Sequence, residues 1–134
     1  MIALDTNILV RSALDDDGAL AVVARRMMER NHCYASLLAI GEMGFVLRSV
    51  YSVDLADVLQ ASRNLLNLPN VECEHALRLA PAFDGVEAGI DWFDALLWAS
   101  TPPGVTLATF DKVFAKRAAV LGWDVAVRLP KTGK

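Results

Sequence analysis

The chain has 134 residues, of which 54% are hydrophobic and 22% charged, and its formal net charge is −3. This composition excludes a disordered chain, and no apolar stretch approaches the roughly 20 residues that cross a membrane. The negative charge argues against binding nucleic acid through overall charge, so a polyanion would need a local basic surface or a bound metal ion.

The first half of the chain predicts three short strands alternating with helices. The first strand is the apolar run at 2–4, and the next two are at 33–36 and 71–73. The helix over 19–30 is indicated by apolar residues at helical spacing, namely Leu20, Val23, Ala24 and Met27. The remaining elements are helices at 6–13 and 37–50, a turn at 15–18, and a helix that begins at Asp54 and ends near Pro69.

The second half continues the alternation. Helices are expected at 74–83, 91–100 and 112–121, with Pro81 as a warning that the first is interrupted. Strands are expected at 105–109 and 125–127. Alternating strands and helices predict an α/β fold, with a parallel sheet of four to five short strands and helices on both faces. Length and composition predict one domain over 1–130, followed by a flexible tail at 131–134.

Four acids lie in apolar surroundings and form the candidate site. Asp5 follows the first strand, and Asp111 follows the run at 105–110. Glu42 and Asp94 lie inside apolar helices. Acids are rarely buried unless they are paired or bound to a cation, and ligands of parallel sheets bind at the carboxyl ends of the strands. The pattern therefore predicts one acidic pocket that binds a divalent metal ion.

Each acid also has an ordinary structural explanation. Asp5 and Asp111 each precede a predicted helix, where a carboxylate caps free backbone N–H groups, and we weigh this role evenly against metal binding. Capping is favoured for Asp91. Glu42 could lie on a solvated stripe of its helix, or form a salt bridge with an arginine, the candidates being Arg48 and Arg11.

Polar neighbours could support the acids. Thr6, Asn7 and Thr109 could fix the carboxylates by hydrogen bonds, or could serve only in helix initiation and turns. Basic residues could contact RNA phosphates, although such residues are more often merely solvated; the candidates are Arg11, Lys112, Lys116 and Arg117. Three tryptophans could stack on bases, but core packing is favoured for all three, which are Trp92, Trp98 and Trp123.

The segments around the four acids resemble the motifs of PIN-domain proteins of the VapC type, the toxins of toxin–antitoxin pairs. The matching segments, in family order, are 2–9 (IALDTNIL), 36–42 (SLLAIGE), 90–96 (IDWFDAL) and 109–116 (TFDKVFAK). The resemblance implies a parallel α/β sheet and a Mg²⁺- or Mn²⁺-dependent endoribonuclease. It also implies a homodimer and an inhibitory cognate antitoxin.

The chemistry of phosphodiester hydrolysis fits such a set of acids. Divalent cations with oxygen ligands activate water and stabilise charge on the phosphate, and Mg²⁺ takes only one or two direct carboxylates. We therefore expect Asp5 and Asp94 to be direct ligands. Glu42 and Asp111 would hold coordinated water or a second ion.

Two other functions remain open. An aspartyl phosphatase would need a second aspartate two residues after the first, and this position is Asn7. The main alternative is a PIN-like module that binds RNA or a protein partner without cutting, although all four acids are present. The hydrophobic content makes the faces around Met27 and Met28 and along 55–66 candidate contact surfaces, although both could simply cover the sheet.

Targeting and redox state also follow from the sequence. Asp5 and Arg11 interrupt the amino-terminal apolar run and no basic segment precedes it, so a signal peptide is not expected. Cys33 and Cys73 are therefore expected to be reduced and partly buried, and the protein to be cytoplasmic.

Overall fold

The computed structural model describes residues 1–14 and 18–131. The predicted turn at 15–18 and the predicted tail at 131–134 therefore lie largely outside the described residues. The contacts of the chain define two compact units, Met1–Ala76 and Leu77–Lys134, and each is described by itself. The single domain over 1–130 stays a prediction.

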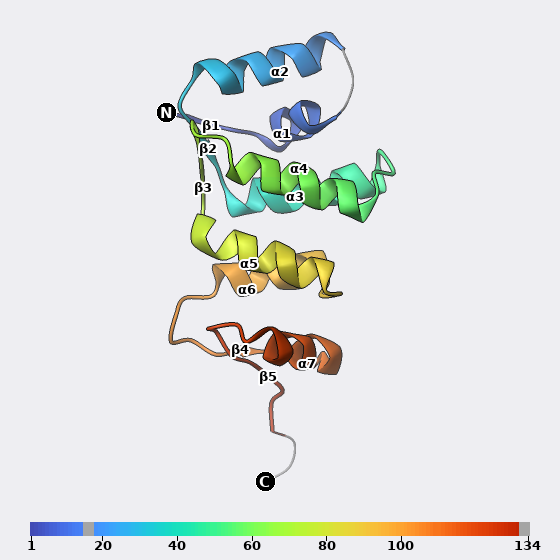
Figure 1. The fold of residues 1–134 in the computed structure, drawn as a ribbon, viewed down its shortest axis with the longest axis vertical. Coiled ribbons are helices and arrows are strands. Elements are labelled where there is room, and N and C mark those ends of the chain that lie inside the picture. The colour runs from blue at the N-terminus through green and yellow to red at the C-terminus, as the bar shows by residue number, and fades with distance from the viewer. Residues whose placement is uncertain (15–17, 132–134) are drawn as a thin grey trace. The chain divides into compact units, whose positions relative to one another are not determined.

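The first unit contains a three-stranded parallel sheet in the order β1-β2-β3. Tyr34 of the central strand pairs with Ala3 on one side and with Glu72 on the other. The elements of this unit, coloured blue to green in Figure 1, are β1 (Ile2–Ala3), α1 (Thr6–Ala13), α2 (Ala19–Arg30), β2 (Cys33–Ala35), α3 (Leu37–Ser49), α4 (Leu55–Leu66) and β3 (Val71–Cys73).

Helix packing builds the core of this unit. Helix α1 packs against both α2 and α3, and α3 packs against α4. Leu9, Ile40 and Val58 are among the fully buried side chains that these contacts produce. On α2 the buried residues are Ala21, Ala24 and Met28, whereas Leu20 and Val23 are exposed. The predicted apolar face of α2 is therefore partly wrong, because small residues let α1 approach closely and turn the larger ones outward.

The second unit contains a separate two-stranded parallel sheet, in which Leu107 pairs with Val127 and Ala108 with Arg128. Its elements are α5 (Ala76–Glu87), α6 (Trp92–Ser100), β4 (Leu107–Ala108), α7 (Lys112–Leu121) and β5 (Val127–Arg128). The α/β class and the parallel strands are confirmed. The described strands number five and are divided into two sheets.

Several predicted elements of the second unit differ from the observed ones, beginning with the strand expected at 105–109, which is only Leu107–Ala108. Helix α5 runs to Glu87 and includes Pro81, so the proline does not end it. The last strand is β5 at Val127–Arg128 instead of 125–127, because Val125 is buried and its carbonyl accepts the Trp98 indole N–H at 3.1 Å.

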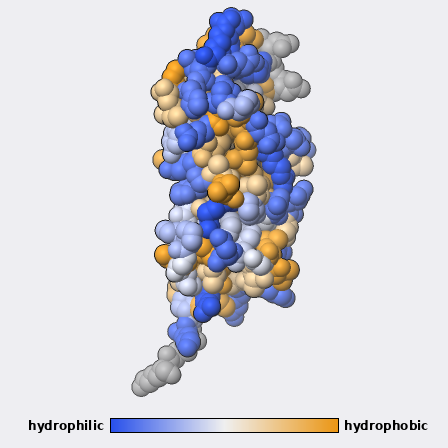
Figure 2. Space-filling view, turned by 60° about the vertical axis from the view of Figure 1, so that its left-hand side comes forward, coloured by the Kyte–Doolittle hydropathy of each residue, from blue (hydrophilic) through white to orange (hydrophobic). Residues whose placement is uncertain are grey.

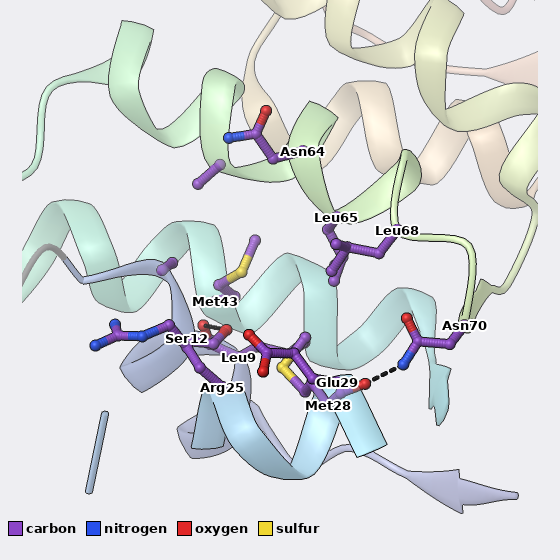
Figure 3. Close-up of a pocket in the computed structure, with 12 residues that line it drawn as sticks. Leu9, Ser12, Arg25, Met28, Glu29, Met43, Asn64, Leu65, Leu68 and Asn70 are labelled. Carbon is purple, nitrogen blue, oxygen red and sulfur yellow. Dashed lines mark hydrogen bonds between the residues drawn. The ribbon is translucent and has the colours of Figure 1, made fainter. Parts of the chain in front are cut away.

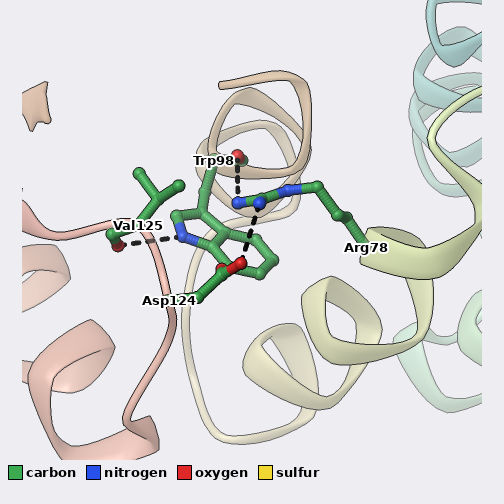
Figure 4. A network of polar contacts seen from close by, with 4 residues as sticks. All are labelled: Arg78, Trp98, Asp124 and Val125. Atoms are coloured by element: carbon green, nitrogen blue, oxygen red, sulfur yellow. Dashed lines mark hydrogen bonds and ion pairs between the residues drawn. The ribbon is translucent and has the colours of Figure 1, made fainter. Parts of the chain in front are cut away.

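A cluster around the buried Trp98 holds the second unit together (Figure 4). Trp98 stacks on Trp123 with a centroid separation of 4.0 Å, and the Arg78 guanidinium carbon lies 4.2 Å from a Trp98 ring centroid. Arg78 also donates to the Asp124 carboxylate at 3.2 Å and to the Trp98 carbonyl at 3.3 Å. Arg78 thus ties α5 to α6 and to the segment that leads into β5.

Both cysteines are free and buried, as expected. Cys33 and Cys73 lie on neighbouring strands but out of register, since Cys33 pairs with Val71 and Cys73 with Ala35. Burial raises the pKa of the Cys73 thiol to about 11. Both thiols are therefore packing groups, and Cys73 is a poor nucleophile at neutral pH.

The surface combines hydrophilic residues with apolar patches, as one face in Figure 2 shows. Over the described residues, the helices are all too short or too polar to cross a membrane.

Candidate functional site

The carboxyl ends of β1, β2 and β3 meet at one edge of the first sheet because the strands are parallel. Three segments leave the sheet there: Leu4–Asp5 after β1, Ser36 after β2, and Glu74 after β3. Backbone hydrogen bonds extend the strand pairing to these ends. The Leu4 N–H donates to the Tyr34 carbonyl, and the Glu74 N–H donates to the Ala35 carbonyl. This edge is the usual ligand-binding edge of a parallel sheet.

Thr6 links the two candidate acids of the first unit. Its backbone N–H donates to Oδ1 of Asp5 at 2.8 Å, and its hydroxyl donates to Oε2 of Glu42 at 3.0 Å. This second bond joins the first turn of α1 to α3, two helices that pack against each other. Both carboxylates are exposed to solvent. The structure therefore brings Asp5 and Glu42 into one hydrogen-bonded group through Thr6, and a role of Thr6 in supporting a metal site stays a prediction.

The surroundings of Glu42 differ from the prediction. Its helical neighbours Leu38 and Phe45 are 73% and 56% exposed, so this part of α3 is a surface and not core. The apolar sequence around Glu42 was therefore misleading about its burial. The prediction that Glu42 lies near the first motif does not depend on burial and is supported by its bond with Thr6.

Glu74 is a further carboxylate at the sheet edge, which the sequence analysis missed. Its Oε1 accepts the Leu37 N–H at 2.9 Å, and its Oε2 accepts the Tyr34 hydroxyl at 3.1 Å. The bond from Leu37 is the main cause that holds the pKa of Glu74 below its usual range, while burial and the Glu74 carboxylate raise the pKa of Tyr34. Glu74 thereby fixes the start of α3, the helix that carries Glu42. An acid directly after a strand, as at Asp5, was the signal that could have identified it.

The second unit holds the other two candidate acids. Asp94 is half-buried in the first turn of α6, and Asp91 caps this helix by accepting the N–H groups of Phe93 and Asp94 at 3.1 and 3.3 Å. Burial is the largest cause that raises the pKa of Asp94, followed by the charges of Asp91 and Asp111. The charges of Asp91 and Asp111 thus add to burial in disfavouring the ionised form of Asp94. The capping role favoured for Asp91 is confirmed.

Asp111 caps α7, since its Oδ1 accepts the Phe114 N–H at 3.0 Å. Its own backbone N–H donates to the Thr109 hydroxyl at 3.0 Å. Thr109 in turn donates its N–H to the carbonyl of Arg128, so the turn after β4 is fixed on both sides. Thr109 takes a turn-forming role and positions the backbone of Asp111.

Capping and metal binding are compatible at these positions. Asp5 and Asp111 each use Oδ1 for the helix and leave Oδ2 outside those bonds. The two roles that the sequence suggested for these residues, helix cap and metal ligand, therefore do not exclude each other. An N-cap also orients the carboxylate, which is an advantage for a ligand.

The donor atoms fit a hard divalent cation. They are carboxylate oxygens with nearby threonine hydroxyls, and oxygen ligands are those that Mg²⁺ and Mn²⁺ prefer. The mutual repulsion that raises the pKa of Asp94 is also what a bound cation would relieve. Within the part of the chain that the structure describes, no group of three or more His, Cys, Asp or Glu side chains is gathered that could hold a metal ion, and the single pocket of four acids stays a prediction.

The predicted RNA-contact residues have different surroundings. Lys112 and Lys116 are exposed on α7, and Arg11 is half-exposed in the last turn of α1. Arg117 donates to the Gly89 carbonyl and so has a structural partner. Asn7 is exposed beside Asp5, and its supporting role stays a prediction.

The tryptophans are core residues, as the sequence analysis favoured. Trp92 and Trp98 are buried, and Trp92 stacks on Phe83 with a centroid separation of 5.7 Å. Trp123 is half-buried against Trp98. Stacking of these three rings on bases is therefore not supported.

A cavity of about 280 Å³ lies in the first unit among α1, α2, α3 and α4 (Figure 3). Leu9, Met43 and Leu65 form apolar parts of its wall, and Arg25 and Glu29 lie at polar parts. Neither Asp5 nor Glu42 lines it. The cavity and the acids are thus separate features of this unit.

Comparison with known proteins gives one family. The PIN domain model matches residues 2–120, which includes all four candidate acids. No curated protein and no solved structure matches the chain.

Proposed function

Because the chain belongs to the PIN domain family, whose members are generally metal-dependent nucleases, we propose that it is a Mg²⁺- or Mn²⁺-dependent endoribonuclease. The observation that carries the proposal is the grouping of acids from distant motifs. Thr6 joins the acids of the first and second motifs by hydrogen bonds, and in the third motif the pKa of Asp94 is raised by burial and then by the charges of Asp91 and Asp111.

The carboxylates have distinct tasks in this proposal. From the motifs, Asp5 and Asp94 would hold the cation directly, and Glu42 and Asp111 would hold coordinated water or a second ion, one of them accepting a proton from the attacking water. A divalent ion, when bound, activates water and stabilises negative charge on the scissile phosphate. Thr6 orients Asp5 and Glu42 together through its two hydrogen bonds.

The biological context of the proposal is a VapBC-type toxin–antitoxin pair, with this chain as the toxin. The motif resemblance supports this context, and it also supports a homodimer and inhibition by a cognate antitoxin. An antitoxin arginine would suit the acids, because a guanidinium pairs with carboxylates in a bidentate geometry. A cytoplasmic location belongs to the same proposal.

A cleavage assay tests the proposed activity. Wild type would be incubated with structured RNA that contains single-stranded loops, in Mg²⁺, in Mn²⁺ and with chelator, beside an Asp94→Asn variant. Cleavage that needs the metal and is lost in the variant would support the proposal. RNA binding without cleavage in any metal would instead favour the alternative, a PIN-like module that binds RNA or a partner. Cleavage that persists in chelator would contradict metal dependence.

A further inference from the structure

Phe110 is an exposed aromatic residue next to a candidate acid. It stands between β4 and Asp111, the cap of α7, and 83% of its side chain is exposed. Single exposed apolar residues are common and need no special explanation. The position of Phe110 distinguishes it, because it lies at the carboxyl end of a parallel strand, where ligands of such sheets bind.

The backbone on either side of Phe110 is fixed. Thr109 donates its N–H to the Arg128 carbonyl at 3.0 Å, and Asp111 donates its N–H to the Thr109 hydroxyl at 3.0 Å. The Asp111 carboxylate in turn accepts the Phe114 N–H, and Phe114 is buried. The backbone of Phe110 is therefore fixed by a hydrogen-bonded turn, so that less backbone entropy is lost when a ligand binds to the ring.

The residues that follow Phe110 suit a nucleotide. Asp111 is a candidate metal ligand, and Lys112 is an exposed cation. Three successive residues thus offer an aromatic face, a carboxylate and an ammonium group. A base can stack on an aromatic ring regardless of its identity, and a lysine can contact the phosphate of the same nucleotide. A protein partner would have to cover a carboxylate and an ammonium group along with the ring, at a cost in desolvation.

We propose that Phe110 is a substrate-binding residue, on which one unpaired base of single-stranded RNA stacks next to the cleaved bond. The inference rests on the proposed ribonuclease function and adds a residue that contacts a base of the substrate. The tryptophans, for which core packing was favoured over base stacking, do not take this role, since Trp92 and Trp98 are buried and Trp123 stacks on Trp98.

Substitutions at Phe110 separate stacking from simple hydrophobic contact. Phe110→Ala should raise KM for single-stranded RNA about 5- to 150-fold, the range expected for loss of one stacked base. Phe110→Trp should restore the wild-type KM, and Phe110→Leu should not. Val120→Ala is the matched control, because Val120 is 81% exposed on α7 and lies at the far end of that helix. The control should leave KM unchanged.

A binding measurement with chelator gives a readout that does not require cleavage. The dissociation constant would be measured by fluorescence anisotropy for a single-stranded oligonucleotide, and for versions in which one base at a time is removed. Wild type should lose affinity when one particular base is removed. Phe110→Ala should bind the intact and the abasic strand equally at that position, since the two changes remove the same contact.

The outcomes separate this inference from the proposed function. Cleavage by wild type with an unchanged KM in Phe110→Ala would overturn the stacking role and leave the ribonuclease standing. Base-specific loss of binding without cleavage in any metal would support the stacking role while the ribonuclease proposal fails. A change of oligomeric state in Phe110→Ala, measured by light scattering, with RNA affinity unchanged would make Phe110 a protein-contact residue and overturn the inference.

Discussion

Two substitutions of Asp111 distinguish its capping role from its proposed role as a metal ligand. Its Oδ1 accepts the Phe114 N–H at 3.0 Å, and its charge is one cause of the raised pKa of Asp94. In Asp111→Asn the side-chain oxygen can still accept this bond, because asparagine caps helices as well as aspartate does. In Asp111→Ala the bond is lost. Capping can be performed by either an aspartate or an asparagine side chain, whereas metal binding requires the carboxylate.

The expected magnitudes are different for the two variants. Asp111→Ala should lower the free energy of unfolding by about 0.5–2 kcal/mol, the usual cost of losing an N-cap. Asp111→Asn should keep or slightly raise it, since one of the charges that repel Asp94 is removed. An ion at 100 times its dissociation constant stabilises a folded protein by about 2.7 kcal/mol, and this gain should be smaller in both variants, because Asp111 is expected to hold coordinated water or a second ion.

Urea unfolding with Mn²⁺ and with chelator measures both effects in one experiment. Wild type should be stabilised by Mn²⁺, Asp111→Asn should match wild type only in chelator, and Asp111→Ala should be weaker in both conditions. The reasoning would be refuted if Mn²⁺ stabilised Asp111→Asn as much as wild type, because the residue would then be only a cap.

Three further predictions follow from individual contacts. Thr6→Val removes the hydroxyl that donates to Glu42 and should weaken Mn²⁺ binding about 10- to 100-fold by calorimetry, whereas Thr6→Ser should not; equal binding in both would exclude the bridge. The pKa of Asp94 is raised on folding, so its charge weakens the apo fold above the folded pKa and the penalty disappears as the pH falls below the ordinary aspartate range. Asp94→Asn should therefore be the more stable chain in chelator at pH 7, and the difference should vanish near roughly pH 3 in thermal melts; a constant difference would contradict this. Arg78→Lys keeps a positive charge but loses the flat stack on Trp98, and urea unfolding should show a loss of about 1–2 kcal/mol; unchanged stability would mean that the cluster is not a structural centre.

The helices were predictable because their boundaries are encoded locally. Helices α1, α2 and α7 have the bounds read from the sequence, and acids precede two of them as caps. Parallel strands were harder, since two-residue strands such as β4 and β5 carry almost no periodic signal. The shift of β5 depends on the bond between Trp98 and the Val125 carbonyl, a contact between distant residues.

The family was predictable from the sequence, but the bonding of the candidate site was not. The order and spacing of Asp5, Glu42 and the later acids were enough to identify the motifs. The Thr6 bridge depends on how α1 packs against α3, which no local pattern specifies. The burial of Glu42 was also predicted wrongly. An apolar stretch has the same sequence pattern whether it lies in the core or on an exposed face, as the stretch around Glu42 does.

The most direct test of the central claim is Mn²⁺ binding by calorimetry to wild type, Asp5→Asn and Asp94→Asn, one substitution from each unit. We expect saturable binding to wild type and a large loss of affinity in both variants, with folding retained by circular dichroism. Binding that is unaffected by both substitutions, or no binding to wild type, would contradict the claim that these carboxylates hold a divalent ion.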